Sequence, residues 1–307
     1  GTYPAGSTVK PVLGMAGLAY NKITPDQTRF CPGEFRVPGS SRRAREGRGG
    51  VHGAVDLRTA IAKSCDVYFY ALSLDLGVDA IHDFLSPFGF GRRTGIDIAG
   101  EVTGILPSQQ WKRDNRREAW YPGDTVNFGI GQGFMTVTPI QLAQMTAVLA
   151  AKGKVHQPRL VTGIRNPETG EVQEVEPISL PDVPGGTPEQ WAVIMEGMRE
   201  TMVSGTARSI SKSAEYTMAG KTGTAQVFSV AQSQSVSAAV QNERLRDHSW
   251  FISFAPAEDP KIAVAVLVEN GGFGASAAAP IARAIFDAYL LPRLKPATAP
   301  PGPGETP

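Results

Sequence analysis

The stretch MAGKTGTAQV, residues 218–227, predicts the first of three β-strands and, with them, the class of fold. We expect this strand over residues 216–227, and the apolar stretches SWFISFA (249–255) and IAVAVLVE (262–269) predict two more. The short connection PAEDPK between the last two is typical of a hairpin, so these strands should pair antiparallel. Gly223 lies inside the first strand, where a glycine usually marks a bulge or the close approach of another segment.

The segments on both sides of these strands are mostly helical. An apolar periodicity follows Ser7, and a closing helix is predicted over residues 277–291. Further helices are predicted over residues 55–62, 67–76, 81–85, 139–151 and 188–203. Loops are predicted over residues 25–53 and 91–124, the second with short strands near TGIDIAGEVTGILP, and a hairpin over residues 159–177. Helices that are followed by an antiparallel sheet and a terminal helix predict an α+β fold.

The composition is that of a globular protein without a strong charge bias. Of the 307 residues, 41% are hydrophobic and 19% are charged, and the formal net charge is +1. This balance argues against a nucleic-acid partner, and no apolar run reaches the ~18 residues that a membrane-spanning helix needs. We expect one domain over residues 1–294, followed by a disordered tail rich in Pro and Gly at residues 295–307.

Ser7 and Lys10 form an S-x-x-K pattern at the start of the first predicted helix. Opening a helix places a serine at the positive end of the helix dipole, and a lysine three residues later lies on the same face. A serine is a good nucleophile only when a base takes its proton, and a lysine can do so only in its neutral form, which burial and a second nearby cation favour. The same pattern recurs at Ser209 and Lys212, where we take it to be chance, so the pattern alone proves little.

Two further motifs supply groups that such a nucleophile needs. The tetrapeptide KTGT, Lys221 to Thr224, lies in the first predicted strand and offers a cation and two hydroxyls to an anionic group of a substrate lying alongside that strand. The tripeptide SCD, Ser64 to Asp66, lies at a junction between helices, where serine and aspartate are also common caps. Each motif alone is commonplace. Their order along the chain is the signature of penicillin-binding proteins and class A β-lactamases.

With these motifs the chain resembles the transpeptidase domain of class B penicillin-binding proteins, of the cell-elongation type (penicillin-binding protein 2). The resemblance covers nearly all of residues 1–293 and rests on the stretches YPAGSTVKP, SCDVYFYALSLDLG, WYPGDTVNFGIGQGFMTVTPIQLAQM, MAGKTGTAQV and LRDHSWFISFAP. The stretches WYPGDTVN and GIGQG favour the elongation type over the division type. The resemblance implies a serine β-lactamase-like fold, in which helices flank an antiparallel sheet beside an all-helical subdomain. Further strands of that sheet are expected upstream of residue 1.

The resemblance also implies a serine acyl-enzyme mechanism for cross-linking peptidoglycan. Ser7 would attack the carbonyl between the two terminal D-alanines of a stem peptide, with Lys10 as the general base and Ser64 as a proton relay. The backbone N–H groups of Ser7 and Thr224 would form the oxyanion hole, whose donors lower the barrier by roughly 3 kcal/mol each. β-Lactam antibiotics would acylate Ser7, and the reaction requires no cofactor.

Substrate binding is implied for the remaining motif residues. Lys221, Thr222 and Thr224 would hold the terminal carboxylate, with Gly223 between the two threonines in the strand. Asp66 would face the substrate backbone, although many relatives have an asparagine there. The chain therefore departs from the common pattern at this one position, where an amide donor is replaced by a carboxylate.

Location and partners follow from the resemblance alone. It implies a domain on the periplasmic face of the bacterial inner membrane, and a SEDS-type glycosyltransferase partner that contacts chiefly an upstream pedestal region. The first residues, Gly1-Thr2-Tyr3-Pro4, contain neither an initiator Met nor a signal peptide. We therefore expect the membrane anchor to lie upstream, outside the sequence.

Four residues of types that bind zinc are spaced along the predicted loop and the helix after it: Cys31, Glu46, His52 and Cys65. Their spacing is not that of a familiar zinc finger. Some elongation-type relatives have acidic, His and Cys residues at matching spacing. The resemblance therefore supports a structural zinc ion at these four residues. A Cys31–Cys65 disulfide and two unrelated free thiols are the alternatives.

Two other functions compete with that of a transpeptidase. A β-lactamase or β-lactam sensor shares the three motifs, but a class A β-lactamase needs a deacylating glutamate between the second and third. The candidates Glu168, Glu171, Glu174 and Glu176 lie in the predicted hairpin, which has no clear Ω-loop pattern. A catalytically silent scaffold of the cell wall is the second alternative, and nothing in the sequence favours it, because every expected reactive residue is present.

Overall fold

A three-stranded antiparallel sheet forms the centre of the fold in the computed structural model, which describes residues 1–47, 50–226 and 246–294. The strands are β9 (Ala219–Ala225), β10 (His248–Ala255) and β11 (Ile262–Val268), in the order β11-β10-β9. Gly223 faces Trp250 across the β9–β10 pair, so β9 offers its other edge to the rest of the molecule. The three predicted strands are confirmed, whereas the predicted end at Val227 lies outside the described residues.

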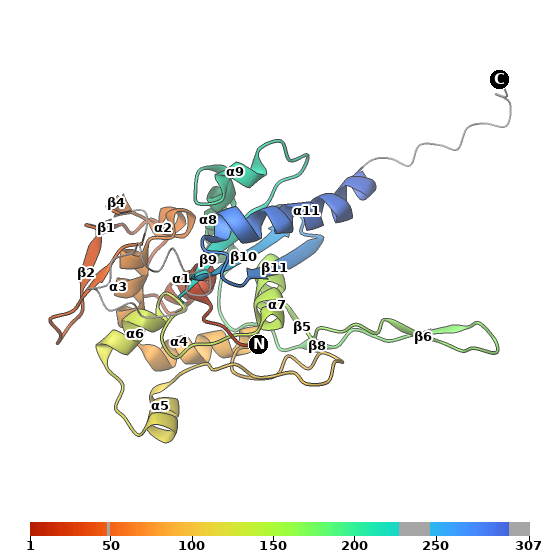
Figure 1. Ribbon diagram of the computed structural model, residues 1–307, viewed down its shortest axis with the longest axis horizontal. Coiled ribbons are helices and arrows are strands. Elements are labelled where there is room, and N and C mark those ends of the chain that lie inside the picture. The colour runs from red at the N-terminus through yellow and green to blue at the C-terminus, as the bar shows by residue number, and fades with distance from the viewer. Residues whose placement is uncertain (48–49, 227–245, 295–307) are drawn as a thin grey trace.

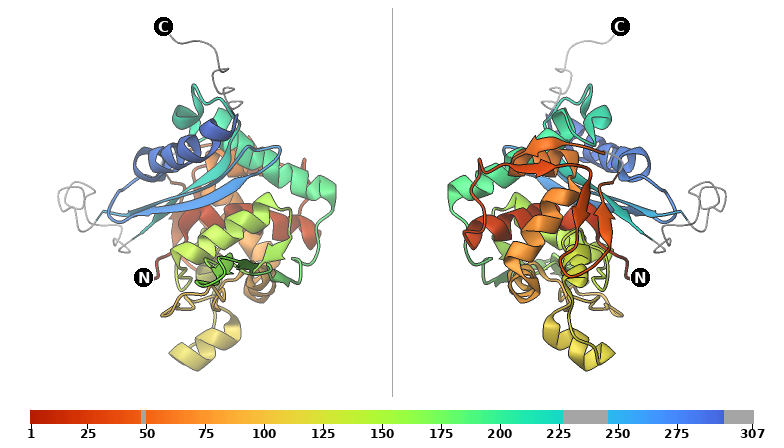
Figure 2. Two further views of the ribbon diagram at one scale, coloured as in Figure 1. Left: turned by 90° about the vertical axis from the view of Figure 1, so that its right-hand side faces the viewer. Right: turned by 90° about the vertical axis from the view of Figure 1, so that its left-hand side faces the viewer.

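Helices cover both faces of this sheet. α11 (Gly274–Leu294) lies on one face and α7 (Pro139–Ala150) on the other (Figure 2). Side chains of β10 alternate between the two sides, as the pleat of a strand requires. Phe251 packs in one hydrophobic cluster with Phe286 of α11, while Trp250 and Phe254 belong to the larger cluster on the opposite side. The sheet therefore separates two hydrophobic cores.

The larger core is built around α1 (Lys10–Ala19), which is preceded by a 3-10 turn, η1 (Gly6–Val9). Nine of the ten residues of α1 are buried, so this helix is surrounded by others rather than lying at the surface. Its neighbours include α2 (Leu57–Lys63), α3 (Asp66–Leu76), α4 (Val78–Leu85) and α8 (Pro188–Val203). The helices predicted in these segments are confirmed (Figure 1).

Thr187 is the N-cap of α8. Its hydroxyl accepts a hydrogen bond from the backbone N–H of Gln190, and the Gln190 side chain accepts one from the Thr187 N–H. This reciprocal capping box satisfies two of the backbone donors that a helix start leaves unpaired. A short helix, α9 (Arg208–Ser211), follows α8 and precedes the sheet.

The prediction of a loop over residues 25–53 was wrong in its detail. This segment contains β1 (Arg29–Cys31), β2 (Glu34–Arg36), β3 (Arg43–Arg45) and β4 (Gly53–Val55). β1 pairs with β4 and β2 pairs with β3, both antiparallel. Strands of three residues are too short to show an alternating apolar pattern, and the Gly and Arg content of the segment is typical of loops.

The short strands predicted within residues 91–124 were also wrong. The described chain there forms two helices, α5 (Gln109–Arg116) and α6 (Pro122–Phe128), and one isolated bridge from Ile105 to Thr136. α5 has the sequence QQWKRDNR and so lacks an apolar stripe that would reveal it. The Ser108 hydroxyl accepts from the Trp111 N–H and so caps the start of α5.

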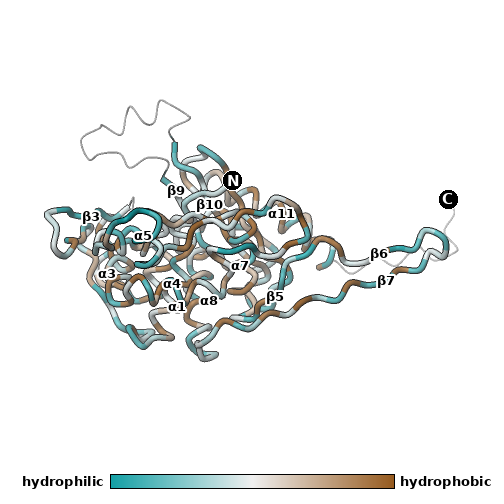
Figure 3. The backbone as a smooth tube through the Cα atoms, turned by 90° about the horizontal axis from the view of Figure 1, so that it is seen from below, coloured by the Kyte–Doolittle hydropathy of each residue, from teal (hydrophilic) through white to brown (hydrophobic). Residues whose placement is uncertain are grey.

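The predicted hairpin at residues 159–177 is confirmed. β6 (Gly163–Arg165) pairs with β7 (Val172–Glu174), and the hairpin projects far from the body of the molecule (Figures 1 and 3). At its base, β5 (Val155–His156) pairs with β8 (Ser179–Leu180). A 3-10 turn, η2 (Ser86–Phe88), completes the described elements.

Two points remain, the predicted disorder of the tail and the search for membrane-spanning helices. The tail at residues 295–307 lies outside the described residues, so its predicted disorder stays a prediction. Within the part of the chain that is described, none of the helices combines the length and the apolar character that crossing a bilayer would take.

Candidate active site

Ser7 lies in the tight turn η1, where three distant segments meet. The backbone N–H of Gly6 donates to the carbonyl oxygen of Gly131 at 2.8 Å. Gly6 has a φ of +58°, and a Cβ atom there would lie 2.4 Å from the carbonyl oxygen of Thr224 on β9. Only glycine fits this position, because both its backbone conformation and its contact with β9 exclude a side chain. The half-buried Ser7 is thereby held against the KTGT strand.

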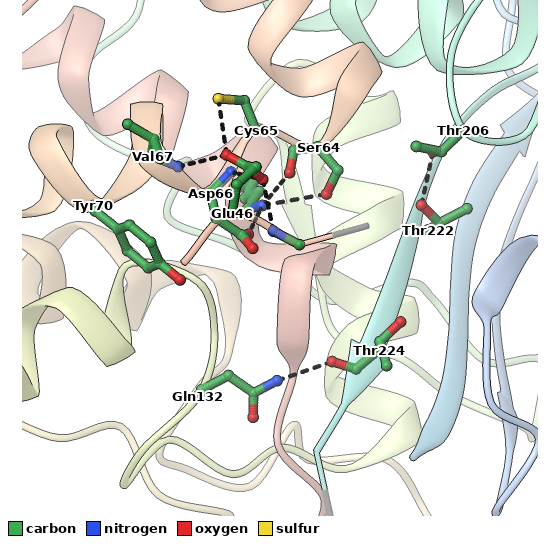
Figure 4. Close-up of polar contacts among 12 residues, drawn as sticks. Glu46, Ser64, Cys65, Asp66, Val67, Tyr70, Gln132, Thr206, Thr222 and Thr224 are labelled. Carbon is green, nitrogen blue, oxygen red and sulfur yellow. Dashed lines mark hydrogen bonds and ion pairs between the residues drawn. The ribbon is translucent and has the colours of Figure 1, made fainter. Parts of the chain in front are cut away.

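Lys10 is fully buried one turn after Ser7, at the start of α1. Its Nζ donates to the backbone oxygen of Ser64 at 2.7 Å, to the Ser64 hydroxyl at 3.2 Å and to the Asp66 carboxylate at 2.5 Å (Figure 4). A lysine without exposed surface needs such partners, since an unpaired buried charge is costly. The first motif and the second are therefore joined directly through this one amine.

Ser64 occupies the junction between α2 and α3, as the sequence predicts. It has φ +59° and ψ +40°, a left-handed conformation that costs a non-glycine residue on the order of 1–3 kcal/mol. This conformation ends α2 and lets both the carbonyl and the hydroxyl of Ser64 reach the Lys10 amine. Local strain of this kind is found where the surrounding structure imposes a geometry, and functional sites are frequent examples.

Lys221 is the second amine that the sequence predicts near Lys10. It is fully buried on β9, and its Nζ donates to the Thr222 carbonyl oxygen at 3.0 Å. Burial holds the pKa of Lys221 well below its ordinary value, and the positive charge of Lys10 lowers it further, while Asp66 opposes both effects. Two buried amines thus influence each other across the site.

The pKa of Lys221 leads to a prediction about stability. The unfolded chain binds more protons than the folded one between the two pKa values of this group, so the free energy of unfolding should rise with pH there. We expect this rise as the pH approaches about 10.4, the ordinary lysine pKa, from below, and its loss in Lys221→Met. Urea unfolding of both proteins across this pH range measures it. Parallel pH profiles of the two proteins would contradict the prediction.

The threonines of the KTGT strand have partners that the motifs did not identify. The Thr222 hydroxyl lies 2.8 Å from the hydroxyl of Thr206, which comes from the connection between α8 and α9 (Figure 4). The carbonyl oxygen of Thr224 accepts from Gln132 Nε2 at 2.9 Å. Gln132 lies in the stretch GIGQG, and the glycines of that stretch are a sequence signal for the close approach of another backbone segment. Thr206 has no such signal in the sequence.

The expected close approach at Gly223 is confirmed. A Cβ atom at this position would lie 2.6 Å from the Thr8 methyl group and 2.9 Å from the Trp250 Cβ. The missing side chain lets η1 pack directly on β9, which brings Ser7 next to the strand. The packing of these two elements therefore depends on glycines from both sides, Gly6 and Gly223.

The four candidate zinc ligands come together beside this site. The ligand atoms of Cys31, Glu46, His52 and Cys65 all lie within 4.8 Å of one another. Glu46 Oε2 lies 3.4 Å from Cys31 Sγ and 3.3 Å from Cys65 Sγ, and both cysteines are buried free thiols rather than a disulfide. The pairing of β1 with β4 places Cys31 opposite Gly53, the residue after His52, and so brings two of the four candidate ligands together.

Glu46 also connects this cluster to the second motif. Its carboxylate accepts from the backbone N–H groups of Asp66 at 2.9 Å and Val67 at 3.0 Å, in the first turn of α3 (Figure 4). Burial alone would raise the pKa of Glu46, but these two donors and the charge of Lys10 outweigh it and lower the pKa. The carboxylate is therefore available as an anionic ligand.

Together these groups have the chemical parts of a serine nucleophile site. A serine begins a helix, a buried amine follows it by one turn, and a second hydroxyl bonds to that amine. A second amine of lowered pKa and two threonine side chains line the adjacent strand. Such a set suits acyl transfer, in which a hydroxyl must lose its proton and an anionic substrate must be held.

Comparison with known proteins gives a consistent answer. A family model described as the penicillin-binding protein transpeptidase domain matches residues 1–287. The peptidoglycan D,D-transpeptidase MrdA of Haemophilus influenzae is 40% identical over 298 residues, which cover 96% of this chain and 45% of that protein. The chain thus spans about half the length of the curated relatives that it matches.

Solved structures agree with this assignment. PBP2 of Pseudomonas aeruginosa, solved in complex with WCK 5153, is 43% identical with a TM-score of 0.83, covering 95% of this chain and 62% of that one. PBP2 of Helicobacter pylori, solved in complex with MreC, is 29% identical with a TM-score of 0.79, covering 95% and 50%. The α+β prediction is confirmed by these neighbours, and the chain belongs to the penicillin-binding protein transpeptidase domain family.

Proposed function

We propose that the chain is the catalytic domain of a peptidoglycan D,D-transpeptidase that cross-links stem peptides during cell elongation. The observation that carries this proposal is the joining of the three motifs around two fully buried lysines, Lys10 and Lys221. The similarity to enzymes named peptidoglycan D,D-transpeptidase supports it.

The first half of the reaction forms an acyl-enzyme. Ser7 Oγ attacks the carbonyl carbon of the penultimate D-alanine while the Lys10 amine accepts the hydroxyl proton. The C–N bond to the terminal D-alanine then breaks, and the leaving amine takes a proton through the Ser64 hydroxyl, which lies 3.2 Å from Lys10 Nζ. The product is an ester on Ser7 and a free D-alanine.

The second half forms the cross-link. An amino group of a neighbouring stem peptide attacks the ester carbonyl and loses a proton to the same relay. The C–O bond to Ser7 then breaks, and the relay returns the proton to the Ser7 oxygen. The backbone N–H groups of Ser7 and Thr224 donate to the oxyanion in both halves. These two donors therefore provide the main electrostatic stabilisation of the transition state. β-Lactams acylate Ser7 in the same way and give an ester that persists.

The carboxylate of the substrate would lie against β9. Lys221, Thr222 and Thr224 offer it an amine and two hydroxyls, and the Thr206 hydroxyl lies 2.8 Å from that of Thr222. Asp66 has a different task from the asparagine of many relatives, because its carboxylate is bonded to the Lys10 amine and cannot donate to the substrate backbone. We propose that Asp66 orients this amine.

Lifetime of a fluorescent penicillin label tests this function against the hydrolase alternative. We expect one label per chain, persisting for many minutes, and no label on Ser7→Ala, while Ser209→Ala labels normally. Turnover of the label within seconds would identify a β-lactamase instead. Absence of any label on the wild-type chain would support the silent scaffold and reject the enzyme. The hairpin that carries the candidate deacylating glutamates projects away from the body, which favours the transpeptidase (Figure 1).

Location and partners follow from the same proposal. The domain would lie on the periplasmic face of the inner membrane and would work beside a SEDS-type glycosyltransferase. The relation to a PBP2 solved with MreC supports a place among the proteins of cell elongation. Co-purification of the full-length protein with its glycosyltransferase, with this domain deleted as the comparison, would show whether the contact lies upstream.

Acyl transfer on Ser7 needs no cofactor, but we propose that a structural zinc ion binds Cys31, Glu46, His52 and Cys65. The donor set fits zinc, which takes two thiolates, an imidazole and a carboxylate in a tetrahedron with ligand atoms roughly 3.5 Å apart. These side chains are all nearly buried, so they would form a closed structural site. The ion would hold β1 and the segment after β3 against the start of α3.

Metal removal tests the zinc proposal. We expect about one zinc per chain and a fall in the thermal midpoint of at least about 4 °C after chelation, equivalent to roughly 1–2 kcal/mol for a domain of this size. Cys65→Ser should contain no zinc and should not respond to the chelator, whereas His156→Ala, which removes an exposed histidine elsewhere, should behave like the wild type. A wild-type protein that is stable and metal-free would contradict the proposal.

A further inference from the structure

The loop after α6, residues 129–133 with the sequence GIGQG, contacts both segments that carry the proposed oxyanion donors. On one side, the Gly131 carbonyl accepts from the N–H of Gly6, the residue before Ser7, at 2.8 Å. On the other side, Gln132 Nε2 donates to the carbonyl of Thr224 at 2.9 Å (Figure 4). Two consecutive residues of one loop therefore link the nucleophile turn to the KTGT strand.

This loop has a rigid backbone. Gly131 donates its N–H to Phe128 at 2.9 Å, and Gln132 donates its N–H to Asn127 at 3.0 Å, so the loop is fixed to the end of α6. Gly131 has φ +69°, and a Cβ atom there would lie 2.1 Å from the carbonyl oxygen of Gly6. Gly131 therefore packs directly against Gly6, with no room for a side chain between them.

The Gln132 side chain reaches β9 where the strand ends. The ladder with β10 pairs Thr224 with Ser249 and stops at Ala225. Beyond this point no further pair of the sheet holds the described strand in place. A hydrogen bond to the Thr224 carbonyl therefore restrains the end of β9 from the side that faces Ser7, opposite to β10.

We propose that Gln132 is a positioning residue for the oxyanion hole, whose side-chain amide fixes the Thr224 backbone so that its N–H and that of Ser7 converge on the reacting carbonyl. This inference rests on the proposed acylation of Ser7. Gln132 itself does not contact the reacting atoms in this assignment. It acts through Thr224, just as Gly131 acts through Gly6.

The expected fall in the acylation rate constant can be estimated from the rate lost when an oxyanion-hole donor is removed. Deleting an oxyanion-hole donor costs about 10²–10³-fold in rate. Without Gln132 the Thr224 N–H remains present but is less well aimed, so we expect the acylation rate constant to fall by about 10- to 100-fold. The affinity for the intact β-lactam should change by less than about 3-fold, since the oxyanion forms only during the reaction.

Stopped-flow acylation of the whole chain by penicillin, which separates the rate constant from the dissociation constant, provides the first measurement. Gln132→Ala removes the amide. Gln132→Glu keeps the shape but offers an acceptor that cannot donate to a carbonyl at neutral pH, so it should be at least as slow. Gln157→Ala is the matched control, because Gln157 Nε2 also donates to a backbone carbonyl, that of Gly95, far from Ser7 in the chain. This control should acylate like the wild type.

The infrared carbonyl band of the acyl-enzyme ester provides a readout that a merely structural role would not move. Strong hydrogen bonds from an oxyanion hole lower this stretching frequency. We expect the band to shift to higher frequency in both Gln132 variants and to stay in place in Gln157→Ala.

The outcomes separate this inference from the function on which it rests. A wild-type protein with no ester band would reject the proposed function and this inference together. A normal wild-type ester with unchanged rate constants and bands in the Gln132 variants would overturn the inference alone. If Gln157→Ala acylated as slowly as the Gln132 variants, the inference would also be overturned, because the slower rate would then reflect a general loss of structure.

Discussion

Replacing Lys10 with alanine is expected to slow acylation by penicillin about 10²–10⁴-fold, the usual contribution of a positioned general base. Lys10 is the fully buried amine that follows Ser7 by one turn and bonds to the Ser64 hydroxyl. Without it the Ser7 proton has no acceptor of comparable basicity on α1. Stopped-flow acylation under saturating penicillin measures the loss directly.

This experiment must separate the basicity of Lys10 from the effects of its charge and its burial. Lys10→Arg keeps a cation beside Asp66 but offers no group that can take up a proton at neutral pH, so it should be slow as well. Lys112→Met is the matched control, because Lys112 is also a buried lysine, with its Nζ 2.7 Å from Asp124 on α6. This variant should lose stability but acylate within about 3-fold of the wild type. Normal acylation by Lys10→Ala would show that another group is the base.

Gly6→Ala is expected to reduce the free energy of unfolding by about 2–5 kcal/mol and to abolish rapid acylation. The left-handed conformation at φ +58° accounts for about 1–2 kcal/mol with alanine. The remaining 1–3 kcal/mol is a typical cost of overpacking, because the new Cβ would lie 2.4 Å from the Thr224 carbonyl. Relief of this clash would move Ser7 away from β9.

Gly39→Ala is a matched control for this substitution. Gly39 has a φ of +71°, but a Cβ atom there meets nothing within 4 Å. Its cost should therefore be only the conformational part, about 1–2 kcal/mol, with normal acylation. Urea unfolding of both variants gives the difference. Equal costs at the two glycines would mean that Gly6 and β9 are not in the contact described.

Much of the candidate site could be predicted from the sequence because its motifs lie on regular elements. Ser7 and Lys10 are one helical turn apart, so their proximity is fixed by local geometry. Lys221 lies on β9, a strand that the sequence predicts, and it is fully buried there. In the chance match, Ser209 lies on the short helix α9 and Lys212 directly follows it, and both residues are exposed.

The rest depends on contacts between distant segments, which leave little trace in a single sequence. Thr206 meets Thr222 only because α8 ends beside β9, and Gln132 meets Thr224 only because α6 ends beside η1. The strands β1 and β4 are three residues long, so their pairing is not visible as a periodic pattern, yet it places Cys31 opposite Gly53, the residue after His52. The sequence shows which residues are reactive, but not which neighbours orient them.

Mass spectrometry of the chain after reaction with penicillin tests the central claim most directly. One penicillin adduct should appear on the intact protein, and fragmentation of a proteolytic peptide should place it on Ser7. Neither Ser64 nor Ser209 should carry it, and Ser7→Ala should remain unmodified. An adduct on another residue, or an unmodified wild-type protein, would contradict the assignment of Ser7 as the nucleophile.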